Sequence, residues 1–151
     1  MPFDNRALSR RWFEEVWNKG REEAIDEMSA PDGVSYGLAE DGRDMPGPEE
    51  FRQFYRQFRS GIPDIHITVD QVIAEGDTTA VRFTARGTHG GDGLGIKATH
   101  RPLRFTGICM LRWKNGQIVQ GWNEFDAAGL VRQIIDPDTD PSSPTAPKVK
   151  I

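Results

Sequence analysis

The chain has 151 residues, a formal net charge of −4 and a hydrophobic fraction of 36%, which fits one domain with a sizeable core. It has no basic cluster, which argues against nucleic acid as a partner, because phosphate recognition needs Lys and Arg gathered on one face. No apolar run approaches the roughly 20 residues that span a bilayer, and the start lacks an apolar signal segment, so we expect no membrane association. The single cysteine, Cys109, excludes an internal disulfide, and we expect a cytoplasmic protein.

Apolar residues recur at helical spacing near the start of the chain. A first helix is predicted over 5–18, with Asp4 or Asn5 as its N-cap. Gly20 ends it. A short second helix is predicted over 21–28, with its charged residues on the solvent side.

A third helix follows after a short irregular segment. We predict a turn at 31–33 and a short strand at 34–38. The third helix begins at Pro48, since proline is favoured in the first helical turn. Its apolar face carries Phe51, Phe54, Tyr55 and Phe58.

From residue 65 the apolar period changes to two, which is typical of strands. The alternation slips by one residue at Asp70-Gln71, and such a slip is what a β-bulge produces. A turn at Gly76-Asp77 leads into a second strand over 79–88. The glycine-rich segment 89–102 predicts a mobile loop over one end of the sheet.

A long hairpin follows, and the rest of the chain is organised around it. Asn115-Gly116 predicts a type I′ turn, because both residues tolerate the positive φ that this turn demands. In the outgoing strand a period of two puts five side chains on one face: Ile118, Gln120, Trp122, Glu124 and Asp126. The apolar Ile118 and Trp122 indicate that this face turns toward a cavity.

Helices first and consecutive antiparallel strands afterwards predict an α+β fold. In it, N-terminal helices cover one face of a strongly curved, mostly antiparallel sheet. A last helical turn or two is predicted over 127–134. We expect one domain over 1–135 and a tail over 136–151, whose Pro, Ser and Asp content is typical of disorder.

Five stretches together resemble the SnoaL-like polyketide cyclase family, within the superfamily named after nuclear transport factor 2. They are WNKG at 17–20, GPEEFRQFYRQFRSGIPD at 47–64, AEGD at 74–77, RGTHGG at 86–91 and FTGICMLRWKNGQIVQGWNEFDAAGL at 105–130. The resemblance implies a cone-shaped α+β barrel with an apolar pocket at one end. It also implies a small hydrophobic ligand, a homodimer through the outer face of the sheet, and no metal or organic cofactor.

In the cyclases that this chain resembles, an aspartate at the end of the final strand is the general acid/base of an intramolecular aldol closure. Asp126 stands at the matching position. The preceding strand, 104–113, contains no histidine that could assist it, and this is a departure from the family pattern.

Two interpretations of Asp126 stay open. A catalytic carboxylate needs a pKa near the working pH, and aromatic burial or a second acid raises it; Trp122 and Glu124 on the same strand face would supply both. Alternatively, Asp126 caps the helix that starts at Ala127.

His89 shares a strand face with Phe83 and Ala85, so we expect it to point into the cone near its rim. There it either assists proton transfer or pins the glycine-rich loop. Tyr36 and Tyr55 either donate a hydrogen bond to an oxyanion or belong to the pocket wall or the core. The three histidines show no metal-ligand spacing, so we predict no metal site.

The predicted substrate-contacting residues are Trp12, Val16, Tyr36, Phe51, Tyr55, Phe58, Phe105, Trp122 and Glu124. The first functional hypothesis is a cofactor-free cyclase or isomerase that moves protons on a small hydrophobic carbonyl compound, with Asp126 as acid/base and His89 or a tyrosine assisting. The second is a non-catalytic module that binds an apolar ligand. The third is epoxide hydrolysis by water held between Glu124 and Asp126. Such a fold can host enzymes and binders alike.

Overall fold

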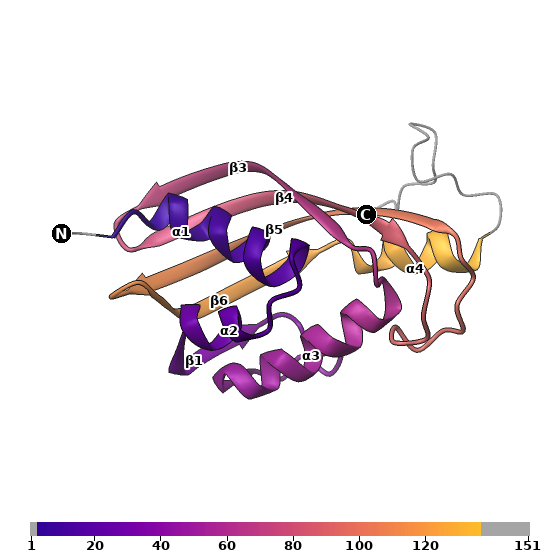
Figure 1. Cartoon of the computed structure of the whole chain (residues 1–151), viewed down its shortest axis with the longest axis horizontal. Coiled ribbons are helices and arrows are strands. Elements are labelled where there is room, and N and C mark those ends of the chain that lie inside the picture. Colours follow the sequence, from indigo (N-terminus) through magenta and orange to yellow (C-terminus); the bar gives the residue numbers. More distant parts are fainter. Residues whose placement is uncertain (1–2, 137–151) are drawn as a thin grey trace.

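A six-stranded sheet forms the centre of the computed structural model, which describes residues 3–136 (Figure 1). The strands lie in the order β2-β1-β6-β5-β4-β3. Their bounds are Ser29–Tyr36 (β1), Met45–Pro46 (β2), His66–Glu75 (β3), Thr78–Thr88 (β4), Pro102–Lys114 (β5) and Gln117–Phe125 (β6). Neighbours run antiparallel except β1 and β6, which are parallel. The sheet curves strongly without closing, so the predicted α+β fold is confirmed. The predicted tail, 136–151, lies outside the described residues except for Asp136.

The helices are α1 (Asn5–Trp12), η1 (Phe13–Asn18), α2 (Glu23–Met28), α3 (Gly47–Gly61) and α4 (Ala127–Ile135). In Figure 1, α1 crosses the sheet, α2 and α3 lie below it, and α4 sits at the far end beside the loop between β4 and β5. No helix between residues 3 and 136 is long and apolar enough to cross a membrane.

The first predicted helix is one continuous rod whose second half is wound as a π-helix. Asp4 caps its start, since the carboxylate accepts hydrogen bonds from the backbone N–H groups of Arg6 and Ala7. From Phe13 the bonds lengthen to five residues, as between Lys19 N and Glu14 O. The wider turn lets neighbouring large residues at the junction, Trp12 and Phe13, both reach the interior.

Two local predictions about the strands are confirmed. Asn115 and Gly116 have φ angles of 52° and 79°, the left-handed conformation that the tight hairpin needs. In β3 the pairing with β4 shifts between Val69 and Gln71, so Asp70 is the extra residue of a bulge.

The predicted orientation of β6 is wrong beyond Ile118. Trp113 pairs with Ile118 while Arg112 pairs with Gln120, which leaves Val119 as an extra residue. A slip of one residue exchanges the two faces of a strand. Past this bulge the side chains that turn inward are therefore Gly121, Asn123 and Phe125, whereas Trp122 and Glu124 point outward.

The predicted turn at 31–33 is also wrong, because these residues belong to β1. The pairing of β1 with β6 is irregular between Ser29 and Val34. Gly33 lies against β6 so closely that a Cβ atom there would stand 2.9 Å from the carbonyl oxygen of Ile118. The Pro-Asp-Gly sequence thus makes an irregularity inside a strand rather than a reversal of the chain.

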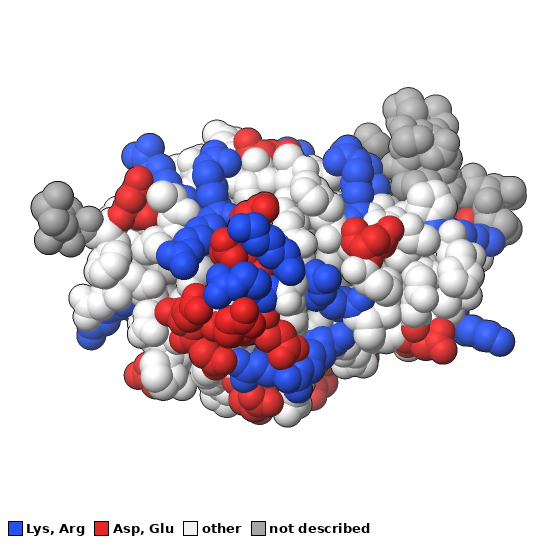
Figure 2. All heavy atoms as spheres, viewed as in Figure 1, with Lys and Arg blue, Asp and Glu red and all other residues white. Residues whose placement is uncertain are grey.

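Ion pairs tie α2 to α3 on the face seen in Figure 2, where red and blue side chains intermingle over these helices. Arg56 Nε and Glu22 Oε1 are 2.5 Å apart, and Arg52 pairs with Asp26. The hydrogen bond from Arg56 lowers the pKa of the Glu22 carboxyl. The cations here are engaged by neighbouring acids, which suits a structural role better than phosphate binding.

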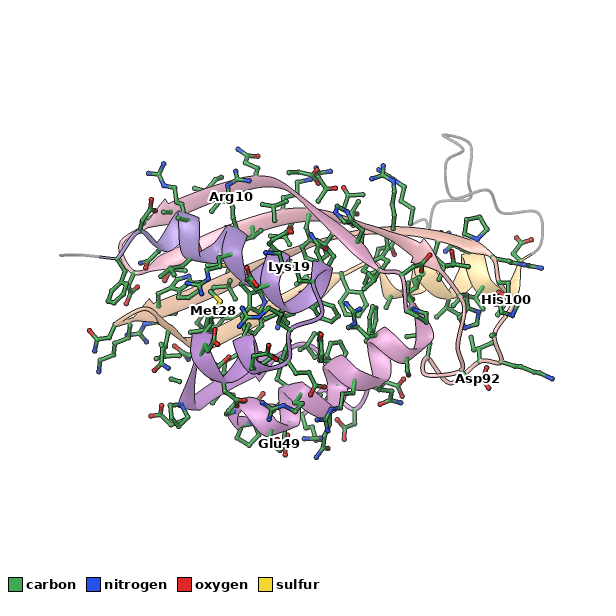
Figure 3. The ribbon with its side chains drawn as sticks, viewed as in Figure 1. Arg10, Lys19, Met28, Glu49, Asp92 and His100 are labelled. Carbon is green, nitrogen blue, oxygen red and sulfur yellow. The ribbon has the colours of Figure 1, made fainter. Side chains whose placement is uncertain are left out.

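The glycine-rich loop packs on the end of α3, and Figure 3 marks it at Asp92 and His100. A Cβ atom on Gly91 would lie 1.9 Å from the carbonyl oxygen of Ser60, and one on Gly93 would lie 2.0 Å from the Ser60 hydroxyl. Only glycine allows this approach, so the loop's composition has a packing reason.

A small buried hydrogen-bond cluster holds α1 to the sheet. The Thr79 hydroxyl lies 2.8 Å from the Ser9 hydroxyl and accepts the Trp113 indole N–H at 3.1 Å. Ser9 and Thr79 are fully buried. The Ser9 hydroxyl also donates to the Asn5 carbonyl oxygen at 2.7 Å. Buried polar groups without partners are costly, so the Trp113 indole N–H depends on Thr79.

We predict that Thr79→Val lowers the free energy of unfolding by about 1–3 kcal/mol, because valine keeps the shape but leaves the buried Trp113 indole N–H without its acceptor. Urea denaturation measures this. Thr68→Val, at an exposed position of β3, is the control and should change stability by less than about 0.5 kcal/mol. Equal effects of the two substitutions would contradict the prediction.

Candidate functional site: an aromatic pocket and its outer groove

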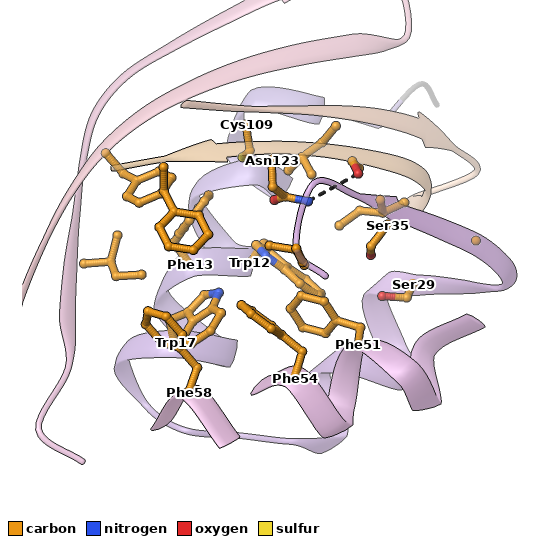
Figure 4. A pocket seen from close by; sticks show the side chains of 18 of the residues that line it. Trp12, Phe13, Trp17, Ser29, Ser35, Phe51, Phe54, Phe58, Cys109 and Asn123 are labelled. Carbon is orange, nitrogen blue, oxygen red and sulfur yellow. Dashed lines mark hydrogen bonds between the residues drawn. The ribbon is translucent and has the colours of Figure 1, made fainter. Parts of the chain in front are cut away.

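Between the helices and the concave face of the sheet lies a narrow cavity, which we call the inner pocket (Figure 4). Its free volume is about 90 Å³. Aromatic rings make most of its wall: Trp12, Phe13, Trp17, Phe51, Phe54, Phe58, Phe83, Phe105 and Phe125. A wall of this kind favours flat, apolar groups.

A wider depression, the outer groove, lies against the inner pocket and has a volume of about 780 Å³. The segment 37–43, α3, the loop residues 93–96 and α4 enclose it. Six residues line both spaces, and we call them the throat: Leu38, Phe54, Phe58, Asn123, Glu124 and Phe125. The groove is therefore the approach to the inner pocket.

The two volumes set a limit on the ligand. A cavity of about 150 Å³ holds one benzene molecule, so the inner pocket at about 90 Å³ has room for at most one ring or a branched alkyl group. The remainder of any larger ligand must lie in the outer groove. The groove carries Glu40, Asp41, Arg43 and Glu50, so this remainder meets polar surface.

The sequence positions the rings through helical spacing. Phe51, Phe54 and Phe58 repeat at three and four residues along α3 and so share one face. Their rings contact each other, with centroids 6.1 Å apart for Phe51 and Phe54 and 5.5 Å for Phe54 and Phe58. The opposite wall comes from the junction of α1 and η1.

Polar groups in the inner pocket are few. Asn123 projects from β6 and Ser35 from β1, both half-buried (Figure 4). Cys109 stands directly across from Asn123 on β5. Burial raises the pKa of the Cys109 thiol to about 12, so at neutral pH it is a neutral weak donor and no base.

Four of the predicted wall residues do line the inner pocket: Trp12, Phe51, Phe58 and Phe105. Val16 and Tyr55 lie behind the wall, in the core. The Tyr55 hydroxyl donates to the Val16 carbonyl oxygen at 2.8 Å, and burial raises the pKa of this hydroxyl. Tyr55 is thus committed to holding η1 on α3.

Tyr36 and Trp122 lie outside the pocket, because the bulge at Val119 turned Trp122 outward. Their rings stack with centroids 5.5 Å apart and an angle of 18° between the planes. Trp122 is 38% exposed. Glu124 is exposed on the same outer side of β6, and as a residue of the throat it is also part of the lining of the inner pocket and the outer groove.

Asp126 is exposed and caps α4. Its carboxylate accepts a hydrogen bond from the backbone N–H of Gly129 at 2.9 Å. A Cβ atom on Gly129 would stand 2.2 Å from Asp126 Oδ2, so glycine leaves room for the cap. Of the two interpretations of Asp126, this geometry supports helix capping, and the side chain lines neither cavity.

His89 is fully buried at the end of β4 and does not reach the inner pocket. Its Nδ1 atom lies 2.9 Å from the Thr99 hydroxyl and accepts from the Thr99 backbone N–H at 3.2 Å. Backbone bonds to Arg101 and His100 complete the attachment. Because Nδ1 accepts, the proton of the neutral ring sits on Nε2. This arrangement pins the glycine-rich loop.

Sequence reasoning missed Asn123, Ser35, Phe13 and Trp17 as pocket residues. Phe13 and Trp17 lie four residues apart in η1 and line the pocket beside Trp12. A faint signal existed for Asn123: moving the phase of β6 by one residue places Phe125 inside and Glu124 outside, which suits burial better. In residues 3–136 no three His, Cys, Asp or Glu side chains are grouped as metal ligands.

We predict that Asp126→Ala lowers the free energy of unfolding by about 1 kcal/mol, the usual cost of a lost N-cap. Asp126→Asn should keep most of the stability that the cap provides, because asparagine is also a good N-cap residue. Thermal unfolding of both variants measures this. If Asp126→Asn were as unstable as Asp126→Ala, the capping role would be contradicted.

Known proteins resemble this chain over most of its length. The structure of IdmH from Streptomyces antibioticus, called "a putative polyketide cyclase", is 29% identical, with a TM-score of 0.77 over 87% of this chain and 99% of that one. TsrD from Streptomyces laurentii is 27% identical, with a TM-score of 0.76 over 88% and 98% of the two chains.

A more distant structure, named a "Putative SnoaL-like polyketide cyclase" from Jannaschia sp. CCS1, shares the fold at 21% identity, with a TM-score of 0.80 over 88% of this chain and 92% of that one. No curated protein matches the chain. The sequence model of the SnoaL-like polyketide cyclases matches residues 7–134, which is most of the chain, and the protein therefore belongs to the SnoaL-like polyketide cyclase family.

Proposed function

We propose that this protein binds a hydrophobic carbonyl compound of polyketide or ester type and promotes its ring closure or isomerisation without a cofactor. The observation that carries the proposal is the aromatic inner pocket opening through a throat into a polar groove. Membership of the cyclase family supports the reaction class. The single cysteine, free and buried, fits the reducing cytoplasm, where we place the protein.

Positioning is the main contribution that this site offers to catalysis. An apolar end held between the rings leaves the carbonyl-bearing part at the throat, where a flexible chain is kept folded. Restricting reacting groups in this way removes much of the entropic barrier to ring closure. The carboxylate best located to take a proton is that of Glu124, which lines the throat, whereas Asp126 is engaged with Gly129.

A non-catalytic ligand-binding module is the second candidate. Among residues 3–136, the titratable residues that line the inner pocket are Glu124, at the throat, and Cys109, whose pKa of about 12 makes it unfit as a base at neutral pH. Epoxide hydrolysis receives less support, since water would have to lie between Glu124 and Asp126, and the Asp126 carboxylate is engaged in its helix cap.

The two candidates are separated by 2-tetralone, a flat bicyclic ketone whose α-protons exchange in D2O. We predict quenching of intrinsic tryptophan fluorescence on binding, because Trp12 and Trp17 line the pocket, and α-exchange faster than in buffer by NMR. Glu124→Gln should reduce this exchange about 100-fold, within the usual range for an acid/base group. Asp126→Asn is the matched control and should leave it unchanged.

Quenching without accelerated exchange would support the binding module instead. If neither effect occurred, both candidates would be contradicted. A loss of exchange in Asp126→Asn but not in Glu124→Gln would return the acid/base role to Asp126.

We also propose that the protein is a homodimer formed through the outer face of the sheet. Cross-strand pairing aligns one row of side chains across five strands of this face: Tyr36, Trp122, Met110, Ala80 and Ile73. Ile73, Met110 and Trp122 are exposed, as is Ile108 beside them. Contiguous exposed apolar surface of this kind marks an interaction site.

Light scattering should therefore give twice the monomer mass of 17.0 kDa for the wild type. Met110→Lys, which places a charge in the row, should give the monomer mass. Ile135→Lys, at an exposed apolar residue on α4, should leave the dimer intact. A wild-type mass of one monomer at all concentrations would contradict the proposal.

A further inference from the structure

The side-chain amide of Asn123, at the throat, has an acceptor oxygen that is not used in a hydrogen bond with the described residues. Asn123 is half-buried and lines both the inner pocket and the outer groove. Its Nδ2 donates to the carbonyl oxygens of Tyr36 at 3.0 Å and Gly121 at 3.3 Å. Both N–H groups are thereby used, while Oδ1 accepts no hydrogen bond from the described residues and faces away from the bond drawn in Figure 4.

The orientation of this amide is fixed by its neighbours. Backbone carbonyl oxygens only accept hydrogen bonds, so rotating the amide by 180° would set Oδ1 against two acceptors. The strands also hold the residue in place, because the end of β1 approaches it closely. A Cβ atom on Gly37 would stand 2.2 Å from the Asn123 carbonyl oxygen. Oδ1 is therefore presented as a preorganised acceptor.

The apolar surroundings of Oδ1 favour ligands that can donate a hydrogen bond to it. Phe54, Phe58 and Phe125 share the throat, and the group directly opposite is the neutral Cys109 thiol. A ligand that fills the throat displaces water from Oδ1. Unless it supplies a donor, it leaves a polar atom without a partner in apolar surroundings, where that loss is most costly.

We propose that Asn123 is a specificity-determining residue, which selects ligands with a hydroxyl or N–H donor placed about one ring beyond their apolar end. The distance follows from the inner pocket, which holds at most one ring before the throat is reached. This proposal rests on the proposed function, since it concerns the same ligand site. It adds the substrate class: an enol, phenol or hydroxylated aromatic compound rather than its ether.

The test compares 2-naphthol with 2-methoxynaphthalene by quenching of tryptophan fluorescence. The two probes share the ring system, but only the first has a donor, and the ether is the more apolar. Hydrophobic burial alone therefore favours the ether. We expect 2-naphthol to bind at least about tenfold more tightly, as a lost buried hydrogen bond predicts.

Asn123→Leu should remove or reverse this preference while still binding the ether. Gln120→Leu is the matched control, because Gln120 is another half-buried amide of β6 but lines neither the inner pocket nor the outer groove, and it should keep the preference. Thermal unfolding checks that Asn123→Leu is folded. The wild-type ratio of the two affinities stands as a test even if that variant is not.

The outcomes distinguish failure of this proposal from failure of the proposed function on which it rests. Equal or tighter binding of the ether to the wild type would overturn the role of Asn123 and leave the hydrophobic site intact. The same holds for an unchanged preference in folded Asn123→Leu. Failure of both probes to bind would overturn the proposed function and, with it, this inference.

Discussion

The extra residue in β6 is the constraint on which the site depends. Because Val119 has no partner on β5, every later side chain of β6 is exchanged between the two faces of the sheet. Asn123 and Phe125 enter the cavity, and Trp122 joins Tyr36 on the outer surface. One inserted residue thus sets both the chemistry of the throat and the apolar character of the outer face.

The site also has two chemically different parts, which would bind different ends of a ligand. The inner pocket is aromatic and small, while the groove beyond the throat is larger and carries several carboxylates beside Arg43. A ligand that satisfies both must be apolar at one end and polar at the other. Such a site directs a reaction chiefly by orientation and by exclusion of water, and the ionisable groups stand at the rim rather than in the interior.

Much of the fold was predictable from local patterns. The aromatic face of α3, the Asp4 cap, the Asn115-Gly116 turn and the bulge at Asp70 each follow from a residue preference that tertiary structure does not override. The candidate site was harder to predict from the sequence, because its residues depend on a bulge in β6 and a π-helical segment. Neither of these has a distinct sequence signal. The role of Asp126 could not be predicted from the sequence for a similar reason. A carboxylate at the end of a strand is compatible with an acid/base group and with a helix cap, and the packing of α4 decides between them.

The proposed binding site places the ligand among the rings of the helices, on the concave side of the sheet. Fluorine NMR of protein labelled with 5-fluorotryptophan tests it, because the four tryptophans report on different places. Trp12 and Trp17 line the inner pocket, Trp113 is bonded to Thr79 in the core, and Trp122 lies outside. With signals assigned by single Trp→Phe variants and protein concentration held constant, added 2-naphthol should shift Trp12 and Trp17 and leave Trp122 unmoved. A shift of Trp122 with Trp12 and Trp17 unchanged would show that the ligand binds on the outer face of the sheet instead.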